Sequence, residues 1–117
     1  MTDLQAAVGR AQLKKLDVFI KRRREIAKRF NEAFAELPLE LPQAENHVYA
    51  RYVVGLDQRD ELQQHLSRFE IEAKRPVYRP LHHYHLDPHA DCPNAERAHQ
   101  RLLSLPIYPS LKDEEVE

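Results

Sequence analysis

Four of the seven histidines and the only cysteine of the chain lie within residues 75–92. All five are residue types that bind zinc, and they are His82, His83, His85, His89 and Cys92. Structural zinc sites, however, usually take their ligands from two spaced pairs, such as Cys-x₂₋₄-Cys with His-x₃₋₅-His, and this segment has one cysteine and no second pair. The spacing therefore favours a surface loop over a metal site, and we expect no metal ligand here.

The first part of this segment combines two arginines, a tyrosine and a histidine with two prolines that stiffen the backbone. Guanidinium groups bind phosphate with two parallel hydrogen bonds, and a phenol and an imidazole can bind sugar hydroxyls. The alternative is a solvated polar strand, which the composition alone does not exclude. The candidate substrate-binding residues are Arg75, Tyr78, Arg79 and His82.

Other motifs for catalysis or for nucleic-acid binding are missing from the sequence. There is no Gly-rich phosphate loop, no G-x-S-x-G and no H-E-x-x-H. The basic run 21–24 is flanked by Asp17 and Glu25, which indicates a solvated helix face with i,i+4 ion pairs. We expect Cys92 to be a helix cap residue. We therefore predict no catalytic residue in this chain and no nucleic-acid partner.

The bulk composition is that of one ordinary globular domain. The chain has 117 residues, a formal net charge of −1, 42% hydrophobic residues and 32% charged residues. One cysteine cannot form an internal disulfide, which favours a reducing compartment. No apolar run reaches the length of about 20 residues that a membrane span needs, and the start does not resemble a signal peptide. We expect a cytoplasmic protein with no membrane partner.

Helical periodicity dominates residues 3–37. Apolar residues spaced by three and four predict one buried face, which Arg23 interrupts. Gly9 weakens the region, so we expect a kink or break between Gly9 and Asp17, and Pro38 ends it. The predicted face consists of Leu13, Leu16, Ile20, Arg23, Ala27, Phe30, Phe34 and Leu37.

The remainder predicts alternating short strands and helices. We expect strands at 47–54, 70–78 and 105–109, the second being an edge strand interrupted by a proline. A helix over 58–68 should bury Leu62, Leu66 and Phe69, and a helix that begins at Pro93 should bury Ala95, Ala98, Leu102 and Leu103. The expected fold class is α+β, a small three-stranded sheet covered by helices.

Both ends of the sequence have helix-start signals. Thr2 and Gln5 form a capping-box pattern, and Ser110 precedes a run of acids that suits the first turn of a helix. Because that last helix has room for only about one turn, we interpret the chain as a fragment of a longer protein.

Three stretches together resemble the C-terminal third of the DegT/DnrJ/EryC1/StrS aminotransferases, the pyridoxal-phosphate-dependent enzymes that act on nucleotide-linked keto-sugars. The stretches are "MTDLQAAVGRAQLKKLDVFIKRRREIAKRFNEAF", "RPVYRPLH" and "CPNAERAHQRLLSLPIYPSLKDEEVE". They cover most of the chain in the family's order. In the commonest pattern of the family, Leu-Gln follows Pro-Leu-His, whereas His83-Tyr84 follow it in this sequence. The resemblance therefore does not assign the sugar.

The resemblance implies that residues 1–117 are the small C-terminal domain of a fold-type-I aminotransferase, including the leading helix 3–37. It implies a homodimer, a nucleotide-sugar substrate, glutamate as amino donor and a role in amino-sugar or polysaccharide biosynthesis. The large domain with the Schiff-base lysine is absent, so we expect the chain alone to be inactive. The resemblance also implies that Arg75, Tyr78, Arg79 and His82 belong to a substrate loop, with Arg for diphosphate and His for the sugar or the cofactor phosphate. His83, His85 and His89 would then have no specific role.

Two other interpretations stay open. The helical face from Leu13 to Leu37 could make the chain a self-associating interaction module. A small His-rich metal-binding protein is the third possibility.

Overall fold

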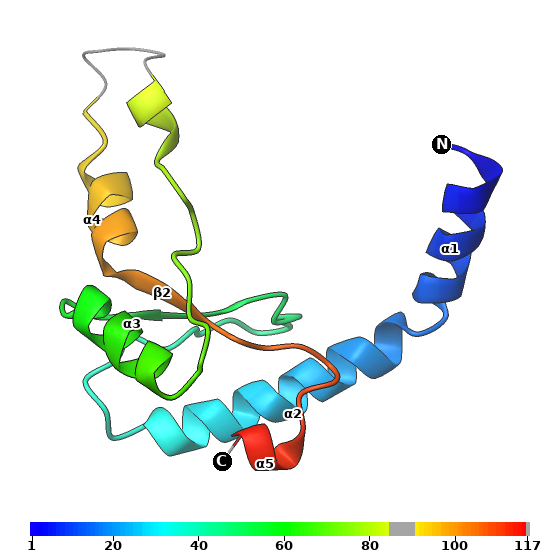
Figure 1. Ribbon diagram of the computed structural model, residues 1–117, viewed down its shortest axis with the longest axis horizontal. Helices are drawn as coiled ribbons and strands as arrows, with labels where there is room; N and C mark the ends of the chain where they lie inside the picture. The colour runs from blue at the N-terminus through cyan, green and yellow to red at the C-terminus, as the bar shows by residue number, and fades with distance from the viewer. Residues whose placement is uncertain (85–90, 117) are drawn as a thin grey trace. The chain divides into compact units, whose positions relative to one another are not determined.

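The structure is a computed structural model that describes residues 1–84 and 91–116 (Figure 1). His85 and His89, two of the histidines that the sequence analysis considered as zinc ligands and rejected, lie outside the described residues. The chain forms two compact units, of which the first comprises Met1–Ala33, Ala44–Ala50 and Ile107–Glu117, and the second Phe34–Gln43 and Arg51–Pro106. In chain order the elements are α1 (Asp3–Leu13), α2 (Leu16–Phe34), β1 (Tyr52–Gly55), α3 (Arg59–Arg68), the 3₁₀ helix η1 (Leu81–Tyr84), α4 (Pro93–Arg101), β2 (Leu102–Leu105) and α5 (Asp113–Val116).

The leading helix predicted over residues 3–37 is two helices, α1 and α2. They are separated at Lys14 and Lys15, within the interval where the sequence predicts a kink or break. Gly9 is not the cause, because it lies inside α1. At the break the Lys15 amide donates to the Gln12 carbonyl, an i to i−3 bond that tightens the chain into a turn.

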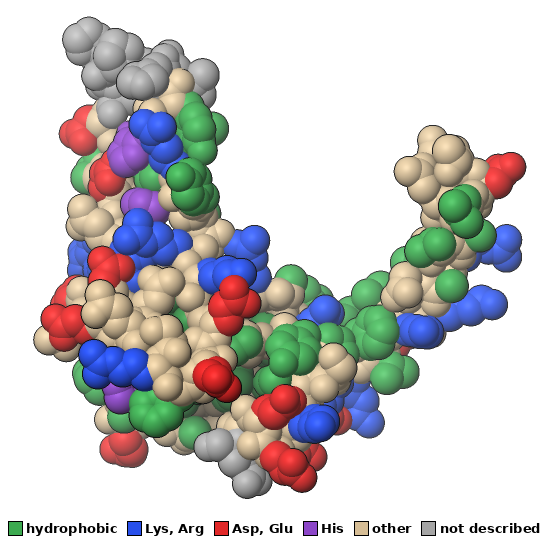
Figure 2. Space-filling model, in the orientation of Figure 1, with side chains coloured by type: hydrophobic (Ala, Val, Ile, Leu, Met, Phe, Trp, Pro, Cys, Tyr) green, Lys and Arg blue, Asp and Glu red, His purple; other side chains and the backbone are tan. Residues whose placement is uncertain are grey.

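The capping box at the start of α1 is confirmed. The Gln5 amide donates to Thr2 Oγ1 at 3.3 Å, and the Thr2 amide donates to Gln5 Oε1 at 2.9 Å. The helix buries none of its own side chains. Leu4, Val8 and Leu13 are 76%, 55% and 68% exposed, and hydrophobic side chains are visible along α1 in Figure 2. The cap therefore fixes where α1 begins, while its apolar side chains remain uncovered in this chain.

The buried face of α2 is narrower than predicted and slightly rotated. Ala27 and Phe30 are buried as expected, but Ile26, which lies outside the predicted stripe, is completely buried as well. Leu16, at the other end of the stripe, is exposed. Arg23 is half-buried, and its Nε has no hydrogen-bond partner among the described residues.

Two arginines of α2 bind the C-terminal segment of the same unit. Asp113 Oδ1 accepts from Arg22 Nη2 at 2.8 Å and from Arg29 Nη1 at 2.9 Å. Arg22 Nη2 also donates to the Leu111 carbonyl at 2.8 Å. The helix α5 begins at Asp113, three residues after Ser110, so the prediction that Ser110 caps it is wrong. Asp113, the first residue of α5, is therefore fixed by two arginines of α2.

The sheet of the second unit has two antiparallel strands. Tyr52 of β1 pairs with Leu105 of β2, and Val54 pairs with Leu103. Tyr52, Val54 and Leu103 are all completely buried. Tyr52 and Val54 are two residues apart in β1, so their side chains point to the same face of the sheet. The core of this unit therefore lies on one face of the β1–β2 pair.

The prediction of a three-stranded sheet is wrong in two places. The expected strand 70–78 supplies a single bridge, in which Lys74 exchanges both backbone hydrogen bonds with Ser104 at 3.0 and 2.8 Å. Pro76 has no amide hydrogen, so the ladder ends there. The expected strand 105–109 lies three residues earlier, as β2, because Pro106 and Pro109 cannot donate to a ladder.

Leu102 and Leu103 belong to β2 and not to the preceding helix, because α4 ends at Arg101. The helix predicted over 58–68 is found as α3, but Phe69, which the pattern places in the core, is 64% exposed. At the α4–β2 junction, Arg101 donates to Asp57 Oδ1 at 2.6 Å and to Glu40 Oε1 at 2.7 Å. The bond to Glu40, followed by that to Asp57, raises the pKa of the Arg101 guanidinium, which stays charged.

We predict that Leu103→Ala destabilises the fold by about 3 kcal/mol, because it leaves a cavity in a closed core. The exposed fraction of Leu103 is 0%, whereas that of Val77 in the same unit is 56%. Val77→Ala is therefore the matched control and should change the unfolding free energy by less than about 0.5 kcal/mol. Urea unfolding followed by circular dichroism measures both. Equal losses for the two variants would contradict the position of the core.

We predict a pH-dependent effect of Asp113→Asn. The hydrogen bond and charge of Arg22, with the nearby Arg29, hold the pKa of Asp113 below its ordinary value of 3.8. The carboxylate therefore stabilises the fold above that value, and the contribution disappears as pH falls through the lower, folded pKa. The variant should unfold earlier in denaturant than the wild type at neutral pH and at the same point in strong acid. Glu114→Gln, at the adjacent acid, is the control; a gap that persists in acid would contradict the ion pair.

Candidate functional site

Residues 75–84, which we call the arm, connect the Lys74 bridge to η1. The Arg51 guanidinium donates to the carbonyl of Pro76, and Pro80 is buried, so the backbone of the arm is fixed at two points. The His83 amide donates to the Pro80 carbonyl at 3.1 Å and begins the turn of η1. The two prolines predicted to stiffen this segment thus lie at its contact points.

The four predicted substrate-binding residues all lie on the arm, but each has a different neighbour. Arg75 Nη2 is 3.4 Å from Asp60 Oδ1, a contact at the edge of hydrogen-bond distance. The Arg79 guanidinium lies 5.1 Å from the ring centre of Tyr84. The Tyr78 side chain is 89% exposed. Within the described residues, then, these side chains do not converge on a single point.

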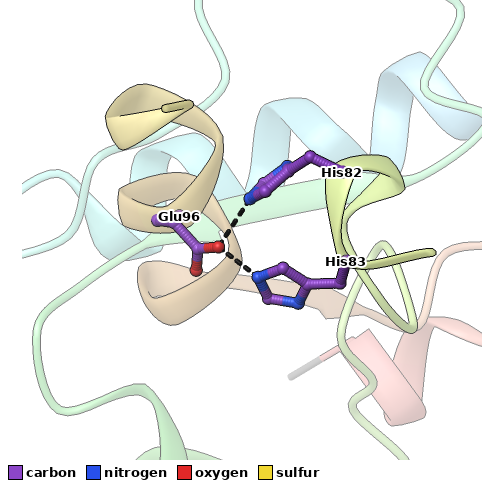
Figure 3. Close-up of side chains that lie close together, drawn as sticks. All are labelled: His82, His83 and Glu96. Carbon is purple, nitrogen blue, oxygen red and sulfur yellow. Dashed lines mark hydrogen bonds and ion pairs between the residues drawn. The ribbon is translucent and has the colours of Figure 1, made fainter. Parts of the chain in front are cut away.

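The fourth predicted residue, His82, belongs to a tighter arrangement with His83 and Glu96, which we call the His–Glu cluster (Figure 3). Nε2 of His82 lies 2.6 Å from Glu96 Oε1, and Nε2 of His83 bonds to the same oxygen. The two rings come from η1 and the carboxylate from α4, and Figure 3 shows both rings directed at the one carboxylate oxygen. The hydrogen bond of His82, and to a smaller extent that of His83, holds the pKa of Glu96 below its ordinary value of 4.5.

The cluster corrects one expectation and reveals one omission. His83, to which the sequence assigned no specific role, contacts Glu96 as closely as His82 does. Glu96 was not predicted as a site residue. It lies fourteen and thirteen residues after the two histidines, a separation that no local motif describes. The only signal was its place in the first turn of a helix that begins at Pro93.

Beside the cluster lies a cavity of about 540 Å³ between the arm and α4. Its walls are mostly apolar. Cys92, which also lines the cavity, lies at the N-cap of α4 as predicted. His82, Cys92 and His99 are the lining residues that have nitrogen or sulfur in their side chains. The apolar residues that line it are Pro76, Val77, Pro80, Leu81, Ala95, Ala98 and Leu102. A mostly apolar pocket with a few polar groups on one side is typical of ligand-binding sites.

Residues 1–117 match the DegT/DnrJ/EryC1/StrS aminotransferase family over their whole length. The chain belongs to this family. It is 39% identical to the spore coat polysaccharide biosynthesis protein SpsC of Bacillus subtilis, over 100% of the chain and 34% of the relative. It is 37% identical to dTDP-4-dehydro-2,3,6-trideoxy-D-glucose 4-aminotransferase of Saccharopolyspora spinosa, over 97% of the chain and 31% of the relative.

Among solved structures the chain resembles DesV of S. venezuelae, determined in complex with a ketimine intermediate. The TM-score is 0.84 at 32% identity, over 96% of the chain and 33% of DesV. The chain thus spans about a third of the length of the relatives that it matches. These relatives place the α+β fold described above among the aminotransferases of this family.

The family implies pyridoxal phosphate as the cofactor of the whole enzyme. That cofactor needs a lysine for its Schiff base, held in a site that also binds the pyridinium nitrogen and the phosphate. All six lysines of this chain are exposed, and none lines the cavity between the arm and α4. They are Lys14, Lys15, Lys21, Lys28, Lys74 and Lys112. The residues present therefore do not fit the cofactor.

No helix among the described residues has the length and apolar character needed to cross a membrane.

Proposed function

We propose that residues 1–117 are the small domain of a pyridoxal-phosphate-dependent aminotransferase that transfers an amino group from glutamate to a nucleotide-linked keto-sugar. The main support is the family match over the whole chain, together with the short span relative to the relatives. The domain would supply a substrate-binding arm and part of a homodimer surface. The product would be an amino sugar for polysaccharide or related glycan synthesis.

The exposed lysines support a division of labour between this chain and a larger domain. A catalytic lysine must be partly desolvated or lie beside another cation so that its amine is unprotonated at neutral pH. Lys74, at the bridge that precedes the arm, instead pairs with the Glu72 carboxylate at 2.7 Å, and 68% of its side chain is exposed, so it is not desolvated. The chemistry would then take place on residues outside this chain.

The geometry of the arm supports a role in binding the nucleotide-sugar. Arg75 is 43% exposed, and its long contact to Asp60 leaves donors available for a phosphate. The position of Arg79 over Tyr84 holds a second guanidinium on the same ten-residue segment. Tyr78, which is almost fully exposed, offers a phenol for a sugar hydroxyl or a face for stacking. His82 would complete the set from the end of the arm, where Glu96 orients its ring.

A chimera tests this proposal with an active enzyme. The aligned C-terminal part of the S. spinosa 4-aminotransferase, to which the chain is 37% identical, is replaced by residues 1–117. We expect the chimera to aminate the dTDP-linked keto-sugar with glutamate as donor. Arg75→Gln in the chimera should raise KM for the nucleotide-sugar about tenfold with a smaller change in kcat, because a charge-assisted bond to a diphosphate is lost.

Arg68→Gln, at the exposed last residue of α3, is the matched control for the charge change. If it raises KM as much as Arg75→Gln does, the arm has no specific role in binding. A chimera that folds and binds pyridoxal phosphate but does not transaminate would refute the small-domain assignment. The isolated 117-residue chain should show no transaminase activity when pyridoxal phosphate is added. In a separate sample, borohydride reduction after incubation with pyridoxal phosphate should leave no specific lysine adduct.

A second candidate function is self-association, and the exposed side chains of α1 favour it. Leu4, Val8 and Leu13 are uncovered over most of their surface. The association face predicted from Leu13 to Leu37 includes Phe30, which is buried, so α1 is the better place to test self-association.

We predict that the isolated chain forms dimers or larger species and that Val8→Asp returns it to the monomer, because a carboxylate cannot be buried unpaired in an apolar contact. Light scattering measures the mass of both proteins. Glu36→Asp, an exposed change that keeps the charge, is the control. A wild-type chain that is monomeric at all concentrations would exclude this second function.

A further inference from the structure

The His–Glu cluster brings three metal-binding side chains together at the surface between the arm and α4. One nitrogen of His82, one nitrogen of His83 and a carboxylate oxygen of Glu96 all lie within 4.8 Å of one another. The two imidazole rings are 4.6 Å apart, centre to centre, and stand edge to face at 70°. All three side chains are partly accessible, so an ion could reach them from solvent.

We propose that His82, His83 and Glu96 form a binding site for one zinc ion. The inference goes beyond the proposed function and does not depend on it. Two histidines and one carboxylate are a ligand set that zinc accepts, and three protein ligands leave one position for water or another group.

The distances suit an ion after a small rearrangement. Zinc binds imidazole nitrogen and carboxylate oxygen at about 2.0–2.2 Å, so neighbouring ligands of a tetrahedral site lie roughly 3.3 Å apart. His82 Nε2 is 2.6 Å from the Glu96 oxygen, so the carboxylate must withdraw by less than about 1 Å. The Glu96 side chain is 35% exposed and can rotate by that amount.

The surroundings favour a borderline metal over a hard one. Cys92 and His99 line the cavity beside His82, and the ring of His99 lies 6.5 Å from that of His83. On α4, Glu96 and His99 are three residues apart and therefore lie on the same helix face, and Cys92 is the N-cap residue that precedes the helix. Nitrogen and sulfur donors select zinc or copper rather than magnesium or calcium, whose sites consist of oxygen ligands.

The sequence has no two spaced pairs of zinc ligands, and the spacing of its histidines and cysteine therefore does not predict a metal site. The structure supplies the third ligand from α4, after a gap that such patterns do not cover. A bound ion would replace two hydrogen bonds to one oxygen by three coordinate bonds and would lock the arm to α4. Since Nε2 of His82 would hold the ion, the ion and the nucleotide-sugar would compete for that side chain.

The test uses the 117-residue chain without an affinity tag, treated with chelator and dialysed. Calorimetric titration with Zn²⁺ alone should give one ion per chain, and Co²⁺ should give the visible absorbance of a four-coordinate site. His83→Ala and Glu96→Gln should each weaken Zn²⁺ binding about tenfold or more, since loss of even an outer partner of a metal ligand costs 10–100-fold. Circular dichroism establishes that both variants are folded.

Two controls separate this site from binding by other histidines. His65→Ala changes a histidine of α3 that stacks on Phe69, and it should leave Zn²⁺ affinity unchanged. The double variant His85→Ala/His89→Ala should bind Zn²⁺ within about threefold of the wild type, a smaller change than loss of a ligand causes. The proposal is overturned if the wild type binds no Zn²⁺. It is equally overturned if the double variant abolishes binding while His83→Ala and Glu96→Gln retain it. Neither outcome bears on transamination.

Discussion

The arrangement of the second unit depends on the pairing of β1 with β2. This short ladder buries Tyr52, Val54 and Leu103 completely, and it is the only place among the described residues where two multi-residue strands pair. Single-residue bridges then attach the flanking segments, Glu40 to Gly55 and Lys74 to Ser104. The arm and α4 form the two walls of the cavity. The arm follows Lys74, which is bridged to β2, and α4 leads directly into β2, so both walls are attached to this one ladder. The site is therefore positioned by a sheet of minimal size.

Arginine side chains hold the irregular segments that such a small sheet cannot. Arg101 joins the α4–β2 junction to Glu40 and Asp57, and Arg51 holds the Pro76 carbonyl at the start of the arm. In the first unit, Arg22 binds both Asp113 and the Leu111 carbonyl. A planar guanidinium with several donors can satisfy backbone and carboxylate oxygens together, which a single lysine amine does less well. Much of the chain outside the helices is thus organised by charge-assisted bonds.

The arm and the His–Glu cluster meet at His82, and this shared residue links the two proposals. As part of a substrate arm, His82 is oriented by Glu96 and presents its ring beside a mostly apolar cavity. As a metal ligand, the same nitrogen is withdrawn from substrate. In both roles Glu96, on α4, holds the His82 ring. The hydrogen bonds of His82 and His83 lower the pKa of Glu96 and so favour its ionised carboxylate.

The sequence by itself determined the family, the α+β class, the capping box of α1, the position of α3 and the start of α4 at Pro93. These follow from local rules: hydrogen bonds three residues apart, helical periodicity and the fixed backbone of proline. The tertiary structure alone decided that Leu102 and Leu103 form a strand, that residues 70–78 give one bridge, and that Glu96 joins two histidines. Short apolar runs fit a helix or a strand equally well, and pairing with a buried partner such as Val54 makes the choice. Side chains more than ten residues apart meet only when the chain has folded, so no spacing could reveal the cluster.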